Sequence, residues 1–246
     1  MSDQASTINV NTIEPQSGTT LTVGKSGQNL VVNADSLKAN VAKDAGGNAL
    51  FTSDGSGTIS GLNSGFGSAQ TLISTTTVSS AVASIAFTSG LDSTYKEYVF
   101  EVINVHPATD ATHFTFNGST DGGSNYNQIK TTSFFYALHD EANTATALTY
   151  ESSLDLAQST DYQPLMRLVG NDNDQAGSGE LHIFNPSSTT YVKNWYWRSN
   201  SIMNSDYSLD IFVAGYFNIT TVIDALDFKF ASGNVDAGTI KMYGIK

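Results

Sequence analysis

Hydrophobic and polar residues alternate with a period of two along most of the chain from about Thr71 onward. Large apolar side chains occupy every second position in segment after segment, with polar or charged side chains between them. Such alternation is typical of β-strands that bury one face. The clearest runs are Tyr98, Phe100 and Val102; Phe114 and Phe116; Leu181 and Ile183; Leu209, Ile211 and Val213; Leu226, Phe228 and Phe230; and Ile240 and Met242.

About ten such strands, separated by turn sequences, predict an all-β fold, an antiparallel and jelly-roll-like β-sandwich. Helical patterns are confined to Leu154–Gln158 and Leu138–Ala142, each long enough for a turn or two. The composition favours the same fold class. Ser, Thr, Asn and Gly make up 99 of the 246 residues, and all four are unfavourable inside helices.

The first 70 residues differ from the remainder, because they contain only two of the 26 aromatic residues, Phe51 and Phe66. Aromatic side chains bury the most area, so we expect the core in a head domain of residues 71–246. Residues 1–70 are interpreted as a small β-rich attachment segment. Its predicted short strands are Thr7–Val10, Thr19–Val23, Leu30–Val32 and Ala49–Thr52.

Strands as short as these need support from further copies of the chain or from a larger assembly. A disordered tail is the other interpretation of the same composition. Ser53–Thr77 is rich in Ser, Gly and Thr and is predicted to be a linker that merges into the first core strand.

The charge of the chain excludes several classes of partner. The formal net charge is −12 and the only arginines are Arg167 and Arg198, which disfavours nucleic-acid binding. No apolar run is long enough for a membrane-spanning helix, and the first residues lack the pattern of a secretory signal. Without cysteine there is no disulfide, thiol nucleophile or thiolate metal site.

Motifs of nucleotide-binding and hydrolytic enzymes are incomplete. Five residues separate Gly18 from Gly24 where a phosphate-binding loop has four, and Gly55–Gly61 misses the dinucleotide spacing. The chain has no Gly-x-Ser-x-Gly motif, and its four histidines lack metal-ligand spacing. We therefore expect no enzyme and no cofactor. A pair of carboxylates that converges only in the folded chain, as in a glycosidase, would leave no local signature.

Two loops are candidate sites. The segment 170–180 offers carboxylate and amide oxygens suited to calcium, although it departs from the twelve-residue calcium-loop pattern and also fits a solvated strand connection. Its carboxylates are those of Asp172, Asp174 and Glu180. The second loop, with Asp121, Asn125 and Tyr126, is a candidate contact site for a receptor or glycan, or simply a turn.

The segment Tyr191–Arg198 is the most distinctive local feature. In a strand, Trp195 and Trp197 lie on one face, and Tyr196 and Arg198 lie on the other. Either face could be a stacking platform for a sugar or another chain. For this reason all four residues are candidate receptor or glycan contacts. The competing interpretation is a core strand, and at least one of the two faces is expected to lie in the core.

Four segments resemble parts of the virion structural proteins of marine tailed phages. Leu226–Ile245 is similar to a closing hairpin of these proteins, and Ser119–Tyr126 to a recurring segment. Asn11–Pro15 and Leu50–Gly57 resemble N-terminal portions of tail-fibre-like proteins. The resemblance rests on structural patterns and brings no catalytic residues. It implies a trimeric, tail-associated component of the virion.

On this resemblance, the leading hypothesis is a homotrimeric tail fibre or tail-associated adhesin. Residues 1–70 would bind other virion proteins, and residues 71–246 would contact the host, with a surface glycan as one possible receptor. The alternatives are a capsid decoration or head-fibre protein, a polysaccharide depolymerase, and a cellular adhesin or carbohydrate-binding module. Because most acidic residues lie beyond residue 70, host contact would depend on hydrogen bonds, stacking or a bridging cation.

Overall fold

The computed structural model describes residues 41–43, 48–54, 56, 58–62 and 69–246. The chain divides into two units, Met1–Phe66 and Gly67–Lys246, and each is treated by itself. The strands predicted at Thr7–Val10, Thr19–Val23 and Leu30–Val32 lie outside the described residues.

The N-terminal unit contains a three-stranded antiparallel sheet of β1 (Val41–Lys43), β2 (Ala49–Ser53) and β3 (Ile59–Leu62), in the order β1-β2-β3. β2 confirms the strand predicted at Ala49–Thr52. β3 falls inside the predicted linker, so that part of the linker prediction is wrong. Asp54 holds the turn before β3, because its Oδ1 accepts hydrogen bonds from the backbone N–H groups of Ser56 (2.7 Å) and Thr58 (3.1 Å).

The C-terminal unit is built from twelve strands that pair only in antiparallel fashion. The described residues contain no helix, so the prediction of an all-β, antiparallel fold is confirmed. The strands are β4 (Gln70–Val78), β5 (Ile85–Phe87), β6 (Glu97–Pro107), β7 (Thr112–Ser119), β8 (Lys130–Asp140), β9 (Thr146–Tyr150), β10 (Gln163–Val169), β11 (Gly177–Phe184), β12 (Lys193–Met203), β13 (Tyr207–Phe217), β14 (Ala225–Phe230) and β15 (Val235–Ile245).

The two predicted helical turns are wrong. Leu138 continues β8, whose pairing extends through Asp140 with β13 and through His139 with β9, and Leu154–Gln158 forms turns and bends. In both places the backbone hydrogen bonds go to neighbouring strands or turns, which removes the need for a helix.

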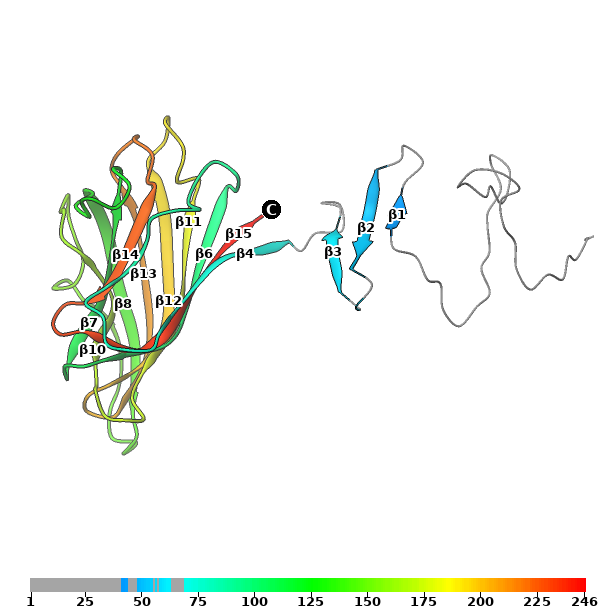
Figure 1. Ribbon diagram of the computed structural model, residues 1–246. Helices are drawn as coiled ribbons and strands as arrows, with labels where there is room; N and C mark the ends of the chain where they lie inside the picture. Colours follow the sequence, from blue (N-terminus) through cyan, green and yellow to red (C-terminus); the bar gives the residue numbers. More distant parts are fainter. Residues whose placement is uncertain (1–40, 44–47, 55, 57, 63–68) are drawn as a thin grey trace, which may run out of the picture. The chain divides into compact units, whose positions relative to one another are not determined.

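The twelve strands form two layers of a sandwich (Figure 1). One layer has the order β4-β15-β6-β11-β12-β13-β8-β9, and the other has the order β10-β7-β14-β5. Only one residue pair, Val169 with Met203, connects β10 to β12, and at this point the hydrogen-bonded sheet passes from one layer to the other.

The jelly-roll arrangement stays a prediction, and the strand order supports it. The larger layer contains the run β4-β15-β6-β11, and the smaller layer has the order β5-β14-β7-β10. Successive segments of the chain therefore cross between layers, as they do in a double Greek key. β8, β9, β12 and β13 extend the larger layer beyond this set.

Aromatic side chains from both layers fill the space between them. Phe116 of β7 packs edge-on against Trp195 of β12, with ring centroids 4.8 Å apart, and Phe114 stacks on Phe228 at 6.0 Å. All four rings are at most 2% exposed. Burying one such side chain contributes about 1.5–3 kcal/mol, and each ring pair adds about 0.5–1.5 kcal/mol.

Glycines on the neighbouring strands make room for the two tryptophans. A Cβ at Gly179 would lie 2.7 Å from the Trp197 ring, and one at Gly215 would lie 3.0 Å from the Trp195 ring. Each position is also within 2.5 Å of a backbone carbonyl oxygen. The large rings therefore fit only where the adjacent strand has no side chain.

Two lysines are buried at one end of the core. Lys130 and Lys193 are both 0% exposed, and each is the register partner of Phe217. The Lys130 Nζ donates to the carbonyls of Gln128 (3.0 Å) and Asp161 (2.5 Å). Burial lowers the pKa of Lys130 to about 7, and it also lowers the pKa of Lys193.

Candidate functional site

The outer face of the larger layer carries the most distinctive group of exposed side chains. From Lys193 to Ser201 the residues of β12 alternate strictly between buried and exposed, so Trp195 and Trp197 point into the core, whereas Tyr196 and Arg198 point outward. The two tryptophans are 2% and 1% exposed. Their assignment as receptor contacts is therefore wrong, because the second layer covers them. Tyr196 and Arg198 remain accessible.

One row of residues in register crosses seven strands of this face. Its first part is charged and its second part is aromatic. In order from β15 to β9 the row is Lys241, Glu101, Glu180, Arg198, Phe212, Phe135 and Tyr150. Residues directly opposite on adjacent strands have Cβ atoms about 4.5–5.5 Å apart, so these side chains contact one another across the face.

Arg198 joins the charged part of the row to the aromatic part. Its guanidinium lies over the Phe212 ring at 5.0 Å, and Phe212 stacks on Phe135 at 5.0 Å with an interplanar angle of 5°. Arg198 Nη2 lies 3.3 Å from Asp210 Oδ2. Because both charged side chains are largely exposed, this ion pair contributes about 0–1 kcal/mol to stability. The ion pair therefore orients the guanidinium and contributes little to the stability of the fold.

The Tyr196 ring has an aromatic neighbour on one side only. Its ring stacks on His182 at 4.5 Å and 13°, and His182 Nδ1 lies 2.6 Å from Glu97 Oε1. On the other side its register partner is the small residue Ala214. Partial burial, together with Glu180 and Glu97, raises the pKa of the Tyr196 hydroxyl. The hydroxyl therefore stays protonated and can both donate and accept hydrogen bonds.

The space above Ala214 is a hollow of about 410 Å³, walled by Tyr196, Arg198, Phe212 and Phe135. A neighbouring depression of about 600 Å³ is lined mostly by residues with polar side chains. Its polar lining consists of Glu101, Ser178, Glu180, Arg198, Ser199, Asn200 and Asp210. Arg198 and Glu180 line both. We call the hollow and the depression together the outer-face site. One aromatic wall beside hydroxyl, amide and carboxylate groups suits a polyhydroxylated ligand.

The Asp121 loop is held together by its own hydrogen bonds. The Asp121 carboxylate accepts bonds from the Ser119 hydroxyl (2.7 Å) and from the backbone (2.9 Å) and side-chain (2.7 Å) N–H groups of Asn125. These bonds lower the pKa of Asp121 to about 2. Tyr126 is half-buried and its hydroxyl faces the interior of the loop region without a hydrogen-bond partner among the described residues. The carboxylate is thus occupied as a turn-holding group, and the loop's role as a contact site stays a prediction.

The calcium candidate is not assembled. Asp172 and Asp174 lie in the loop before β11, but Glu180 lies on the outer face of β11. Within the part of the chain that the structure describes, no group of three His, Asp or Glu side chains is placed to hold a metal ion. The loop is instead tied to β6, since its Asp172 carbonyl lies 3.1 Å from His106 Nε2.

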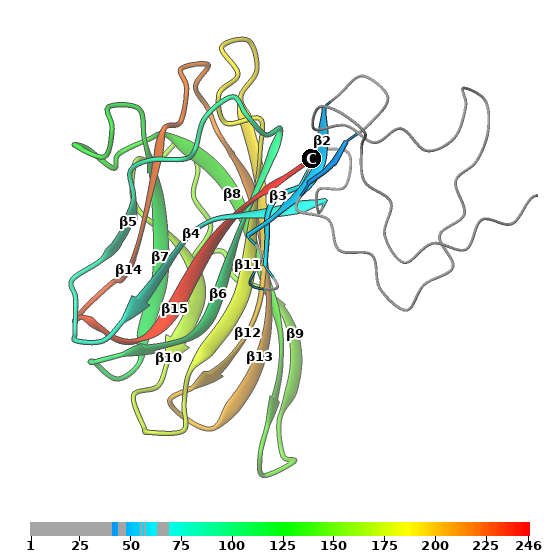
Figure 2. The same ribbon diagram turned by 45° about the vertical axis from the view of Figure 1, so that its right-hand side comes forward.

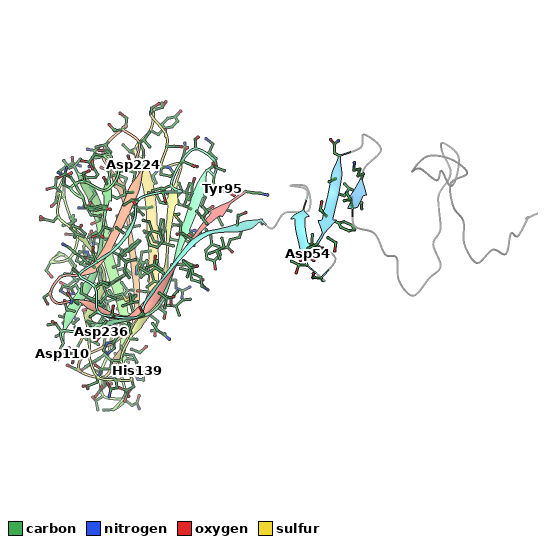
Figure 3. All side chains as sticks on the ribbon, in the orientation of Figure 1. Asp54, Tyr95, Asp110, His139, Asp224 and Asp236 are labelled. Atoms are coloured by element: carbon green, nitrogen blue, oxygen red, sulfur yellow. The ribbon has the colours of Figure 1, made fainter. Side chains whose placement is uncertain are left out.

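The two candidate loops lie at opposite ends of the sandwich. The Asp121 loop is tied to Asp224, whose carboxylate accepts a hydrogen bond from Gly122 N at 3.1 Å. The Asp172 loop is tied through His106 to Asp236 (2.6 Å). Figure 3 shows Asp224 near one end of the C-terminal unit and Asp236 near the other. The structure therefore brings neither the Asp121 loop nor Asp172 and Asp174 to the outer-face site; of the three carboxylates of the candidate calcium segment, Glu180 alone lines it.

Comparison with known proteins identifies no relative of this chain: no protein-family model, curated protein or solved structure matches it. Among the described residues, no helix has the length and apolar character required to cross a membrane. The function must therefore be inferred from the geometry and from the resemblance of individual segments.

Sequence reasoning missed most of the outer-face site. Phe135, Phe212 and Ala214 were not singled out, although Phe212 stands at a polar position of an alternating strand. An aromatic residue on the wrong face of an amphipathic strand is a usable signal for an exposed contact. Which strands lie side by side is a tertiary property that this signal does not contain.

Proposed function

We propose that this chain is a structural and adhesive virion protein, a tail fibre or tail-associated adhesin that attaches the particle to its host. Residues 1–70 would join it to other virion proteins, and residues 71–246 would form the head, in a homotrimer. The resemblance of the segments in and around β7, β14 and β15 to phage virion proteins supports the virion assignment. The outer-face site supports the adhesive role.

The observation that carries the proposal is the hollow above Ala214. Tyr196 presents a ring face there, and Arg198 and Glu180 provide hydrogen-bonding groups at its border. A sugar ring needs this combination of an aromatic surface and directed polar groups. We therefore propose a glycan of the host surface as the ligand. Several identical heads would raise a weak single contact to a useful avidity.

The acidic character of the chain restricts the receptor. With a net charge of −12, long-range attraction to an anionic surface contributes nothing to adhesion. The outer-face site contains both signs of charge within a short distance, and its arginine is paired with Asp210. Neutral sugars recognised through hydrogen bonds and stacking fit this site better than strongly anionic ones.

The adhesive role can be tested by a substitution that fills the hollow with a large side chain. Ala214 is exposed and faces outward, so Ala214→Trp should leave the fold intact and block the ligand. We expect at least about a tenfold loss of binding to purified host surface polysaccharide, equal to about 1.4 kcal/mol. Asn194→Trp, on the same face of β12 but away from the hollow, is the matched control. Equal binding by both variants and the unaltered chain would contradict the assignment of the hollow.

A capsid decoration or head-fibre protein is the alternative within the same class. It shares the fold and the oligomeric state, and it differs only in its position on the particle. Labelling the protein in intact particles separates the two: signal confined to the tail supports the proposal, and signal over the whole shell supports the alternative.

A polysaccharide depolymerase is the second candidate function, and one observation favours it. Glu101 and Glu180 are register partners on β6 and β11, and both line the polar depression. Two neighbouring carboxylates on one surface are what glycoside hydrolysis requires. However, Glu101 Oε2 already contacts Lys241 Nζ and the Tyr243 hydroxyl, each at 3.3 Å. Shortening of host polysaccharide chains on incubation, abolished by Glu180→Gln, would establish the enzyme instead.

A further inference from the structure

The strand β9 forms an open edge of the larger layer. β9 pairs with β8 alone, and Figure 2 shows it at the margin of the C-terminal unit, beside β13 in this view. Its residues 146–148 and 150 are exposed, and Thr149 is half-buried. One side of its backbone therefore presents free N–H and C=O groups, which are a template for pairing with another strand.

The sequence of β9 has none of the features that protect an open edge. Natural edge strands are shielded by charged residues, proline or bulges. β9 reads Thr-Ala-Leu-Thr-Tyr, without a charge or a proline, and its pairing with β8 has no bulge. Leu148 is 77% exposed and Tyr150 is 56% exposed. An uncharged strand of this composition has high intrinsic tendency to pair.

Phe135 extends this apolar surface onto β8. It is the register partner of Tyr150 and is 39% exposed, and Leu148 lies two positions away on the same face of β9. We call Leu148, Tyr150 and Phe135 the β9 patch. Exposed large apolar side chains that gather at one place, rather than scattering, mark a contact surface.

The edge is fixed in position before any partner arrives. Asp140, at the end of β8, accepts hydrogen bonds from the backbone N–H groups of Thr144 (2.8 Å) and Ala145 (2.7 Å), which holds the turn into β9. At the other end the Tyr150 hydroxyl donates to Asp155 Oδ2 (2.6 Å), and Glu151 N donates to the Phe134 carbonyl (2.9 Å). A preorganised edge loses little conformational entropy on association.

We propose that the β9 edge and the β9 patch are a contact between copies of this chain. The charge distribution favours a second copy as the partner. At a net charge of −12, two copies repel one another wherever acidic surfaces meet. β9 itself carries no charged residue, and acidic side chains such as Glu141 and Asp155 lie beyond its two ends, so the repulsion is smaller here than where acidic surfaces meet. Of the proposed function, this inference uses only the presence of several copies.

The backbone edge and the patch would act together in this contact. Strand pairing provides directional hydrogen bonds, and Leu148 and Tyr150 lose their exposure to water on the same side of the strand. One ring face of Phe135 is covered by Phe212, and Phe212 is covered by Phe135 and by the Arg198 guanidinium. Their exposed edges therefore suit packing against another protein surface better than stacking on a sugar.

The test is the mass of the full chain in solution, measured by light scattering during gel filtration. We expect a multiple of 26.2 kDa for the unaltered protein and the mass of one chain for Leu148→Lys. Because Leu148 is exposed, the substitution should not destabilise the fold of the single chain. The substitution also makes the net charge less negative, so general repulsion cannot explain a loss of association.

Leu72→Lys is the matched control. Leu72 is 53% exposed on β4, the other edge strand of the same layer, and this variant should keep the mass of the unaltered protein. A monomeric unaltered protein, an associated Leu148→Lys variant, or dissociation of both variants would each overturn the assignment to β9. Glycan binding by the hollow, which shares Phe135 with the β9 patch, is tested separately by the Ala214→Trp experiment.

Discussion

The two faces of β12 carry the same kind of residue and use it in opposite ways. On the inner face Trp195 and Trp197 are at most 2% exposed and meet the rings of the second layer at varied angles. On the outer face Tyr196 is 41% exposed, and its ring lies almost parallel to that of a side chain on the neighbouring strand. Successive residues of one strand therefore belong to a core and to a contact surface.

The difference shows how burial, rather than residue type, decides the role of an aromatic side chain. Inner rings fill a closed volume, so they need room from glycines on adjacent strands and tolerate little change. Outer rings stack in register, because adjacent strands space them regularly and nothing packs on top of them. Stability should therefore depend on the inner face, and binding on the outer face.

The largest expected effect is the loss of an inner ring. Trp197→Ala removes a side chain packed against Gly179 and Phe114 and should reduce the free energy of unfolding by about 3–5 kcal/mol. Urea denaturation of the protein, followed through the unfolding transition of the C-terminal unit, measures this loss. Tyr196→Ala, one residue away, is the control and should cost less than about 1 kcal/mol. Similar losses for both variants would contradict the division of roles between the two faces.

A smaller effect should come from the buried lysine at the end of the core. Lys130 has a pKa of about 7 in the folded chain and an ordinary value of about 10.5 when unfolded. Between these values the unfolded chain binds the extra proton, so stability rises with pH from about 7 upward, by at most about 1.4 kcal/mol per pH unit from this group. Below pH 7 the folded chain bears the full cost of burying the charge.

Lys130→Met tests this dependence, because it removes the charge and keeps most of the side-chain volume. The variant should be more stable than the unaltered protein at pH 6, and the rise in melting temperature between pH 7 and pH 9 should diminish. Lys241→Met is the control: Lys241 is paired with Glu101 at the surface, and that carboxylate raises its pKa. An unchanged pH dependence in Lys130→Met would show that Lys130 stays charged.

The smallest expected effect concerns the ion pair on the outer face. Arg198→Ala breaks the contact with Asp210 and removes the guanidinium from the Phe212 ring. The free energy of unfolding, measured by thermal denaturation, should change by less than about 1 kcal/mol. Glycan binding should fall, because the guanidinium borders both parts of the outer-face site. A large loss of stability together with unchanged binding would reverse the roles assigned to the two faces.

Much of the fold followed from the alternation pattern. The segments around Tyr98, Phe114, Leu181, Leu209, Leu226 and Ile240 all proved to be strands with the apolar positions buried. Alternation is a local property, since neighbouring side chains of a strand point to opposite faces. It therefore also predicted that Tyr196 and Arg198 lie opposite Trp195 and Trp197. It did not show which of the two faces is covered.

The assembly of the candidate site was beyond local pattern. Phe135 and Phe212 come from β8 and β13, more than 70 residues apart, and contact each other only because these two strands pair in one register. The same holds for Glu101 and Glu180 on β6 and β11. Asp172 and Glu180 are near in sequence, yet they do not form a site together with Asp174.

The amino-acid sequence by itself determined the fold class, the face to which each strand residue points, and the concentration of aromatic residues after residue 70. Each of these depends on residue type and spacing alone. Only the tertiary structure decided which face of β12 is covered, which strands border it, and that β9 ends a layer. Those features depend on long-range strand pairing, whose register is set by how the whole core packs rather than by any one segment.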